Sequence, residues 1–273
     1  MPSLADHQSN DFTKLCCMGN PGTGKTGGLT SLVAAGYNLR ILDLDNGLES
    51  LKNYVLKECP DKIGNIEYRT LRDKRKATAA GPAMVGAPKA FIDTLKMLDR
   101  WKYDDIDLGP PAEWGPDCIL VLDTLTFLSD AAWNFYDSIN ANPDKRSTFF
   151  EAQKGILAVL SQLNSDHFET NVILNSHIVF VDTDDGKTKG FPSTIGKAIA
   201  SKVNAYFNTV ALFETSSGGK RTIRTVPTRT IDLKNPKPFD MAEEYPIETG
   251  LASIFEVLRN KPQAKVTSIK RKA

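Results

Sequence analysis

The sequence predicts an α/β protein built around a mainly parallel, doubly wound sheet. Segments typical of strands alternate with segments typical of helices along the 273 residues. Residues 118–122 form an unbroken apolar run, as expected of a strand buried on both faces of a parallel sheet, and residues 171–175 form a second buried strand. A glycine-rich loop lies between the first expected strand and the first expected helix, which is the order that a parallel nucleotide-binding sheet requires.

The elements follow in order along the chain. The expected strands are 14–18, 39–44, 66–70, 118–122 and 171–175, followed by an antiparallel hairpin made of 209–214 and 220–226 around Ser216-Ser217-Gly218-Gly219. The expected helices are 25–35, ended by Gly36, and 91–102, 127–140, 147–164 and 249–260. Residues 72–90 are rich in Arg, Lys, Ala, Gly and Pro, which indicates a mobile loop or an insertion, and 104–117 form an acidic turn segment.

The composition is that of a soluble globular protein. Hydrophobic residues make up 41% and charged residues 25% of the chain, and the formal net charge is +1. The N-terminus is polar, with no apolar core of a signal peptide, and no run reaches membrane-spanning length. The four cysteines form no C-x-x-C pair, so we expect a cytoplasmic protein with reduced thiols and no membrane partner.

The strongest motif is GNPGTGKT at residues 19–26, which matches G-x-x-x-x-G-K-[ST] in full. Its glycines allow successive backbone N–H groups to point at a phosphate, and the following helix adds its positive end. Lys25 should reach the β- and γ-phosphates of ATP, and the Thr26 hydroxyl should bind Mg²⁺. The expected nucleotide-binding residues are Asn20, Pro21, Gly22, Thr23, Gly24, Lys25 and Thr26.

Acidic residues at strand ends should complete the site. Asp123 ends the apolar run ILVLD, where a carboxylate would lie in the ligand crevice and hold Mg²⁺ with Thr26. Thr124 follows where many ATPases have Glu, so the carboxylate that polarises water must come from elsewhere. Asp45, at the end of the second strand, is the first candidate and Glu49 the second.

The segments LRILDLDNGLESL, ILVLDTLTFL and NVILNSHIVF resemble those of RecA-like P-loop ATPases over residues 13–235. Within that family the chain most resembles the compact AAA/RecA-like ATPases that bacteriophages encode for single-strand annealing and recombination. The resemblance implies one ATPase domain over 13–260, with insertions or mobile loops at 72–117, a flexible N-terminus at 1–12 and a basic tail at 261–273. It also implies that His177, at the strand tip where the family often has Gln, senses the γ-phosphate.

Positive charge is concentrated late in the chain. Residues 186–237 hold ten basic and two acidic side chains, whereas residues 1–185 hold 18 basic and 26 acidic ones. The resemblance implies that the loop at 183–197 and the helix after it contact single-stranded DNA, through Lys187, Lys189, Phe191, Lys197 and Lys202. It also implies that a cation after the hairpin, Arg229 or Lys234, reaches the ATP of a neighbouring subunit.

The sequence therefore predicts a Mg²⁺-dependent ATPase that binds single-stranded DNA, self-assembles with ATP at the subunit interface, and promotes annealing or recombination. A single-stranded-DNA-binding protein is one candidate partner. A hexameric helicase or motor, a small-molecule or nucleotide kinase with residues 69–76 as its lid, and a non-hydrolysing ATP sensor or filament protein remain alternatives. A GTPase is disfavoured because the chain has no [NT]-K-x-D guanine motif.

Overall fold

The structure is a computed structural model that describes residues 12–140, 144–183 and 186–259. The basic tail expected at 261–273 lies outside the described residues, as does all but residue 12 of the N-terminus expected to be flexible.

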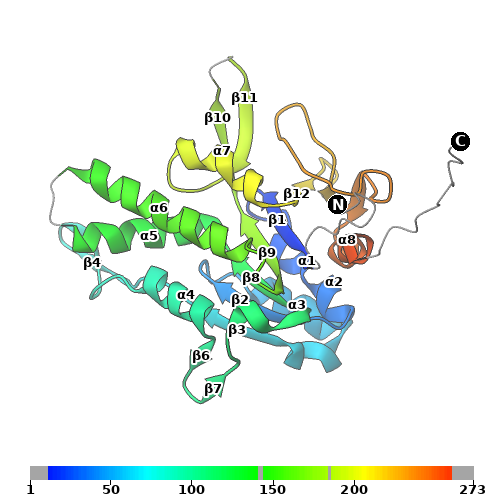
Figure 1. The fold of residues 1–273 in the computed structure, drawn as a ribbon, viewed down its shortest axis with the longest axis horizontal. Helices are drawn as coiled ribbons and strands as arrows, with labels where there is room; N and C mark the ends of the chain where they lie inside the picture. Colours follow the sequence, from blue (N-terminus) through cyan, green and yellow to red (C-terminus); the bar gives the residue numbers. More distant parts are fainter. Residues whose placement is uncertain (1–11, 141–143, 184–185, 260–273) are drawn as a thin grey trace, which may run out of the picture.

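A central sheet of eight strands organises the protein (Figure 1). The strands are β1 (Lys14–Gly19), β2 (Asn38–Asp43), β3 (Ile66–Thr70), β8 (Gly115–Asp123), β9 (Thr170–Ser176), β12 (Thr209–Thr215), β13 (Arg221–Arg224) and β14 (Glu244–Pro246). Their order is β14-β13-β12-β1-β9-β8-β2-β3, and all pairs from β12 to β3 are parallel. β12 pairs antiparallel with β13, and β13 pairs antiparallel with β14, so the predicted parallel sheet with a C-terminal antiparallel hairpin is confirmed.

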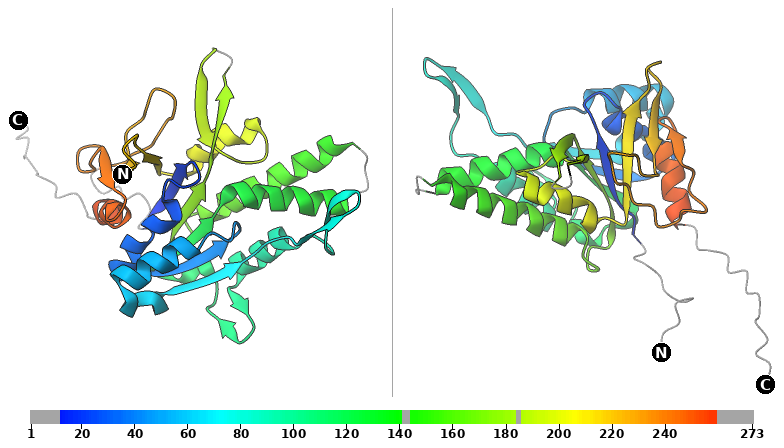
Figure 2. Two further views of the ribbon diagram at one scale, coloured as in Figure 1. Left: turned by 180° about the vertical axis from the view of Figure 1, so that it is seen from behind. Right: turned by 90° about the horizontal axis from the view of Figure 1, so that it is seen from above.

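Helices cover both faces of the sheet, as Figure 2 shows from above. They are α1 (Lys25–Gly28), α2 (Thr30–Ala34), α3 (Glu49–Glu58), α4 (Ala90–Asp99), α5 (Leu125–Ile139), α6 (Lys145–Leu163), α7 (Lys197–Tyr206) and α8 (Gly250–Arg259), with short 3₁₀ turns η2 (Pro60–Asn65) and η3 (Pro111–Glu113). Successive strand residues point to opposite faces. Cys16 and Leu120 pack in the core under α4–α7, whereas Cys17 and Val121 pack in the core under α2, α3 and α8. This division confirms the doubly wound arrangement.

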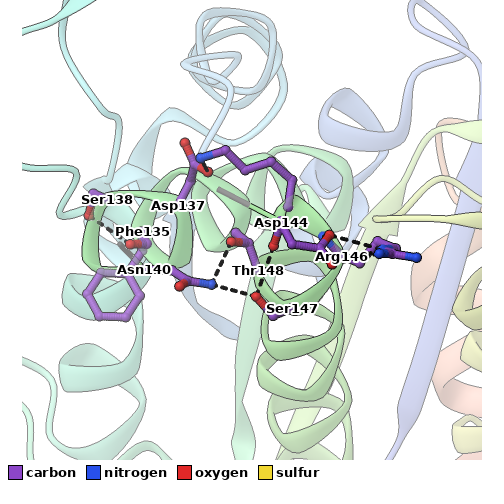
Figure 3. Close-up of polar contacts among 9 residues, drawn as sticks. Phe135, Asp137, Ser138, Asn140, Asp144, Arg146, Ser147 and Thr148 are labelled. Carbon is purple, nitrogen blue, oxygen red and sulfur yellow. Dashed lines mark hydrogen bonds and ion pairs between the residues drawn. The ribbon is translucent and has the colours of Figure 1, made fainter. Parts of the chain in front are cut away.

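Polar contacts join the two long helices α5 and α6 (Figure 3). The amide of Asn140, just after α5, donates to the hydroxyls of Ser147 and Thr148 at 2.9 Å each. Asp144 caps α6 by accepting from the backbone N–H of Arg146 at 3.0 Å. These contacts fix the antiparallel helix pair that covers one face of the sheet beside the tip of β8.

The first helix differs from the prediction. Instead of one helix over 25–35, the chain breaks at Leu29 into α1 and α2. The N–H of Leu29 bonds to the carbonyl of Thr26, three residues back, at 3.3 Å. The preceding Gly27-Gly28 pair disfavours a regular helix, and Gly36 ends α2 in the left-handed region (φ 98°) as expected.

The segment expected as insertions or mobile loops at 72–117 is largely ordered secondary structure. It contains the hairpin β4 (Arg75–Thr78) and β5 (Gly81–Met84), the hairpin β6 (Lys102–Tyr103) and β7 (Ile106–Asp107), and α4 between them. α4 belongs to the core, where Phe91 and Leu98 are buried. The β4–β5 hairpin instead projects from the body of the protein (Figure 2).

The prediction of a loop at 183–197 is wrong in part. Residues 188–192 form β11 (Thr188–Pro192), which pairs antiparallel with β10 (Ile178–Asp182) in a hairpin that stands out from the sheet (Figure 1). Its Gly, Thr and Lys content resembles that of a loop. The strand is formed by cross-strand pairs such as Val179 with Phe191, which join residues twelve positions apart in the sequence.

The four cysteines, all within the described residues, are free thiols as predicted. Among the described helices, none is both long and apolar enough to cross a membrane.

A buried lysine anchors the start of β1. Lys14 is 5% exposed, and its Nζ donates to the carbonyls of Phe168 (2.7 Å) and Thr170 (2.6 Å) at the start of β9. Burial lowers the pKa of Lys14 from 10.5 to about 7. A neutral amine has two N–H donors, which matches the two carbonyls.

We predict that Lys14 makes stability depend on pH. Between about pH 7 and 10.5 the unfolded chain holds a proton that the folded chain lacks, so stability rises with pH by up to about 1.4 kcal/mol per unit. Urea unfolding at pH 7, 8 and 9 should show this rise in wild type and in Lys57→Met, an exposed control, but not in Lys14→Met. Equal pH slopes in all three proteins would contradict the assignment.

Candidate functional site

The phosphate loop, residues 19–26, connects β1 to α1 at the carboxyl edge of the sheet. Gly22 (φ 81°) and Gly24 (φ 94°) adopt the left-handed conformation, which few other residues tolerate. A Cβ atom on Gly19 would lie 2.6 Å from Thr23 Oγ1, so this position has no room for a side chain. The loop therefore has the tight curvature that the motif predicted.

Lys25 is buried and faces back along the phosphate loop. Its Nζ donates to the carbonyls of Gly19 (2.6 Å) and Asn20 (3.1 Å). Burial lowers its pKa, and the negative charge of Asp123 partly opposes that effect. The ammonium group thus lies at the loop, near the place where a bound phosphate would meet it.

Asp123 joins the phosphate loop to the end of β8. The carboxylate is fully buried, and its Oδ2 accepts a 2.7 Å hydrogen bond from Thr26 Oγ1. Its Oδ1 has no hydrogen-bond partner among the described residues. Burial raises the pKa of Asp123, while Thr26, the amide of Asn175 and Lys25 oppose the rise.

This donor set fits Mg²⁺. The ion takes oxygen ligands and is usually held by one or two carboxylates together with substrate phosphates. The unsatisfied Asp123 Oδ1 and the Thr26 hydroxyl supply such oxygens side by side. In the described part of the chain there is no cluster of three His, Cys, Asp or Glu that would hold a metal without a nucleotide.

The strand ends align polar residues across the sheet. Asp43 of β2 is in register with Asp123 of β8, which is in register with Asn175 of β9. Asp43 is buried and accepts from the N–H groups of Asn46 (2.8 Å) and Gly47 (3.3 Å). It therefore fixes the turn after β2, a role that the sequence analysis did not assign.

That turn places Asp45 in a cleft beside the phosphate loop. Its Oδ1 is buried and has no hydrogen-bond partner among the residues described. Burial and the negative charges of Asp123 and Asp43 raise the pKa of Asp45 from 3.8 to about 6. An ionisable group of this kind in a cleft is typical of a catalytic site.

These residues line one cleft of about 580 Å³. Of the predicted site residues, the lining includes Pro21, Gly22, Gly24, Lys25, Thr26, Asp45, Asp123 and His177. Asn20 and Thr23 belong to the loop but do not line the cleft. His177 contacts Phe127 edge to face at 6.0 Å between ring centroids, and burial together with Lys25 lowers its pKa.

Two of the predicted catalytic residues lie outside the cleft lining. Glu49 begins α3, where it is exposed and forms an ion pair with Lys52 at 3.3 Å. Arg229 is exposed in the segment after β13. The structure brings Asp45, rather than Glu49, to the phosphate loop.

Among the lining residues that the sequence analysis did not assign to the cleft are Tyr54, Phe127 and Arg221. Arg221 Nη1 donates to Tyr54 Oη at 3.4 Å, so β13 and α3 meet beside the loop. The sequence analysis expected a cation after the hairpin, Arg229 or Lys234, to reach a neighbouring subunit, whereas Arg221 lines the cleft of its own chain.

The residues expected to contact DNA lie on or beside the β10–β11 hairpin and on α7. Lys187 precedes β11, while Lys189 and Phe191 belong to it. Lys189 forms an ion pair with Asp232 at 2.7 Å. Lys197 and Lys202 are exposed on α7.

We predict that Asp45→Asn stabilises the nucleotide-free protein above pH 6. The raised pKa means that ionised Asp45 opposes folding above pH 6, and that this cost disappears as pH falls towards 3.8. Asparagine should therefore add about 1–3 kcal/mol at pH 7.5 by urea unfolding, and little at pH 4. Glu49→Gln, an exposed control, should change stability by less than about 0.5 kcal/mol. A less stable Asp45→Asn protein at pH 7.5 would contradict the assignment.

The chain shows low similarity to several proteins of known structure. The chain shows 12% identity and a TM-score of 0.46 to the RadB recombinase, over 89% of this chain and 90% of that one. It shows 13% identity and a TM-score of 0.44 to an ATPase from the type III secretion system of pathogenic bacteria, over 76% and 51% of the two chains. It shows 11% identity and a TM-score of 0.44 to the ATPase EscN of enteropathogenic E. coli, over 76% of this chain and 42% of that one.

No curated protein matches the sequence. The family model described as an AAA domain (AAA_24) matches residues 11–236, which include the phosphate loop, Asp45, Asp123 and His177. Because the match extends over most of the chain, the protein belongs to this AAA domain family.

Proposed function

We propose that the protein is a RecA-like ATPase that binds ATP with Mg²⁺, hydrolyses it, and binds single-stranded DNA as a self-assembled oligomer. The observation that carries the proposal is the hydrogen bond from Thr26 to Asp123, beside Lys25, in one cleft. A role in annealing or recombination in the cytoplasm, and kinship with bacteriophage enzymes, follow from the sequence resemblance and remain predictions.

The phosphate loop would bind the β- and γ-phosphates through its N–H groups. Lys25 would exchange its carbonyl partners, Gly19 and Asn20, for phosphate oxygens. Thr26 and Asp123 would hold Mg²⁺, which supplies positive charge to the phosphate oxygens when it is bound.

Asp45 is the residue best placed to orient the attacking water. Besides Asp123, which pairs with Thr26, Asp45 lines the cleft with a buried Oδ1 that has no hydrogen-bond partner among the described residues. Asp43 holds its turn in place through Asn46 and Gly47. Arg221 lines the same cleft and would stabilise charge on the transferring phosphoryl group.

DNA binding is proposed for the β10–β11 hairpin and α7. One residue, His177, separates the end of β9 from the start of β10. The backbone carbonyl of His177 accepts from Ser193 N at 2.8 Å, just after β11. The cleft and the hairpin therefore share this residue, which gives a short route between ATP and DNA. Arg229, exposed and outside its own cleft lining, is available to a neighbouring subunit.

We predict that hydrolysis requires Lys25 and Asp45 but not Glu49. Lys25→Ala should weaken ATP binding at least tenfold, and Asp45→Asn should lower kcat by at least about 100-fold with little change in ATP affinity. Since only ionised Asp45 can accept a proton, kcat/KM should fall as pH drops through about 6. Phosphate release and fluorescent-ATP binding measure these effects. A Glu49→Gln protein that loses hydrolysis while Asp45→Asn retains it would overturn the assignment.

We predict that single-stranded DNA stimulates hydrolysis and that α7 contributes to binding. Removing two phosphate contacts in Lys197→Gln/Lys202→Gln should reduce the slope of log affinity against log salt by about 1.4. Fluorescence anisotropy with a labelled oligo-dT, alongside an exposed control Lys57→Gln/Lys96→Gln, measures this. If ATP turnover ignores DNA and DNA binding ignores ATP, the proposed function fails.

A further inference from the structure

The chain between β3 and α4 carries a second group of cations. Residues 69–89 contain six basic side chains and one acidic one, and they are Arg69, Arg72, Asp73, Lys74, Arg75, Lys76 and Lys89. Arg69 stacks on Tyr103 and lies 4.0 Å from Asp104. Within the described part of the chain, Arg72, Lys74 and Arg75 form no ion pair.

The acid in this segment is already engaged. Asp73 Oδ1 accepts from the backbone N–H groups of Lys89 (2.8 Å) and Ala90 (3.0 Å) at the start of α4. Its Oδ2 accepts from the amide of Asn134 at 3.2 Å, and Asn134 Oδ1 in turn accepts from Arg75 at 3.3 Å. Asp73 therefore fixes the base of the β4–β5 hairpin and holds Arg75 in place through Asn134.

Three of the six cations line a cavity of about 800 Å³ between the β4–β5 hairpin and α5, here called the arm cavity. Arg72, Lys74 and Arg75 lie on its hairpin side, and Asp130 lies on its α5 side. The β4–β5 hairpin itself is mostly exposed and has small side chains over residues 77–83, so it buries no core of its own. An ordered, projecting arm with a basic base is suited to holding an anionic partner.

An aromatic side chain connects the arm cavity with the nucleotide cleft. Phe127, in the first turn of α5, lines both and is 37% exposed. Phe127 also contacts the ring of His177, at the base of the β10–β11 hairpin. An exposed aromatic face beside cations matches the two features of a single strand, namely unpaired bases and phosphates.

We propose that the arm cavity binds single-stranded nucleic acid, with a base against Phe127 and phosphates on Arg72, Lys74 and Arg75. The strand would continue past His177 to the β10–β11 hairpin, so this inference rests on the proposed DNA binding and extends it to a second surface. A duplex does not fit as well, because its bases are paired and stacked and cannot reach Phe127.

The test is anisotropy with labelled oligo-dT, an abasic strand of equal length and a duplex, at several salt concentrations. In Arg72→Gln/Lys74→Gln/Arg75→Gln the affinity for oligo-dT should fall about tenfold at 0.1 M salt, and the salt slope by about 2. The control Lys57→Gln/Lys96→Gln/Lys102→Gln removes equal charge, with Lys57 and Lys96 in the last turns of α3 and α4. The melting temperature and the ATP affinity of each variant show whether that variant is correctly folded.

Stacking is tested separately. Wild type should prefer oligo-dT to the abasic strand, and Phe127→Ala should lose about tenfold of that preference.

A triple variant that behaves like the control overturns the inference, while a defect in Lys197→Gln/Lys202→Gln leaves the proposed function standing. Equal losses for duplex and single strand overturn the single-strand assignment. If the triple variant binds DNA normally but loses a wild-type ability to transfer phosphate to a nucleoside monophosphate, the inference is overturned. The cavity would then be the site that binds the phosphate acceptor. If wild type binds no nucleic acid, both proposals fail.

Discussion

The hydrogen bond between Thr26 and Asp123 is the contact on which the site depends. It joins the first turn of α1 to the end of β8, although β9 separates β8 from β1 in the sheet. Such a contact across an intervening strand requires the strands to end at the same level. The parallel register provides this, since Asp123 aligns with Asn175 and Asn175 with Cys17.

That alignment has an electrostatic cost. Asp43 and Asp123 lie close enough to Asp45 to raise its pKa, and Lys25 is a buried cation that interacts with Asp45 and Asp123. Asp43 is satisfied by backbone N–H groups, whereas Asp45 and Asp123 each keep an oxygen without a hydrogen bond in the described structure. Groups left unsatisfied in this way oppose folding but favour binding of a cation. The repulsion is thus concentrated where a metal-bound nucleotide would relieve it.

Local signals decided which parts were predictable. The phosphate loop and Asp123 follow from short motifs, and the two-core sheet follows from apolar runs. Tyr54, Phe127 and Arg221 carry no such signal, because the packing of α3, α5 and β13 around the loop brings them to the cleft.

Glu49 and Asp45 are four residues apart, and the turn held by Asp43 places Asp45 rather than Glu49 in the cleft beside the phosphate loop. β11 was missed for a similar reason, since a strand outside the central sheet is defined by its partner rather than by its own composition.

The junction between β9 and β10 has a mechanical consequence. The hairpin is rooted at His177 and Ser193, beside the cleft, and extends for five residues on each side, or about 16 Å. At that length a tilt of about 10° at the root displaces the far end by about 3 Å, close to the rise of one strand residue. The root of the hairpin therefore lies at the edge of the cleft that His177 lines. A small rotation at the strand tip would therefore displace the far end of the hairpin by about the rise of one strand residue.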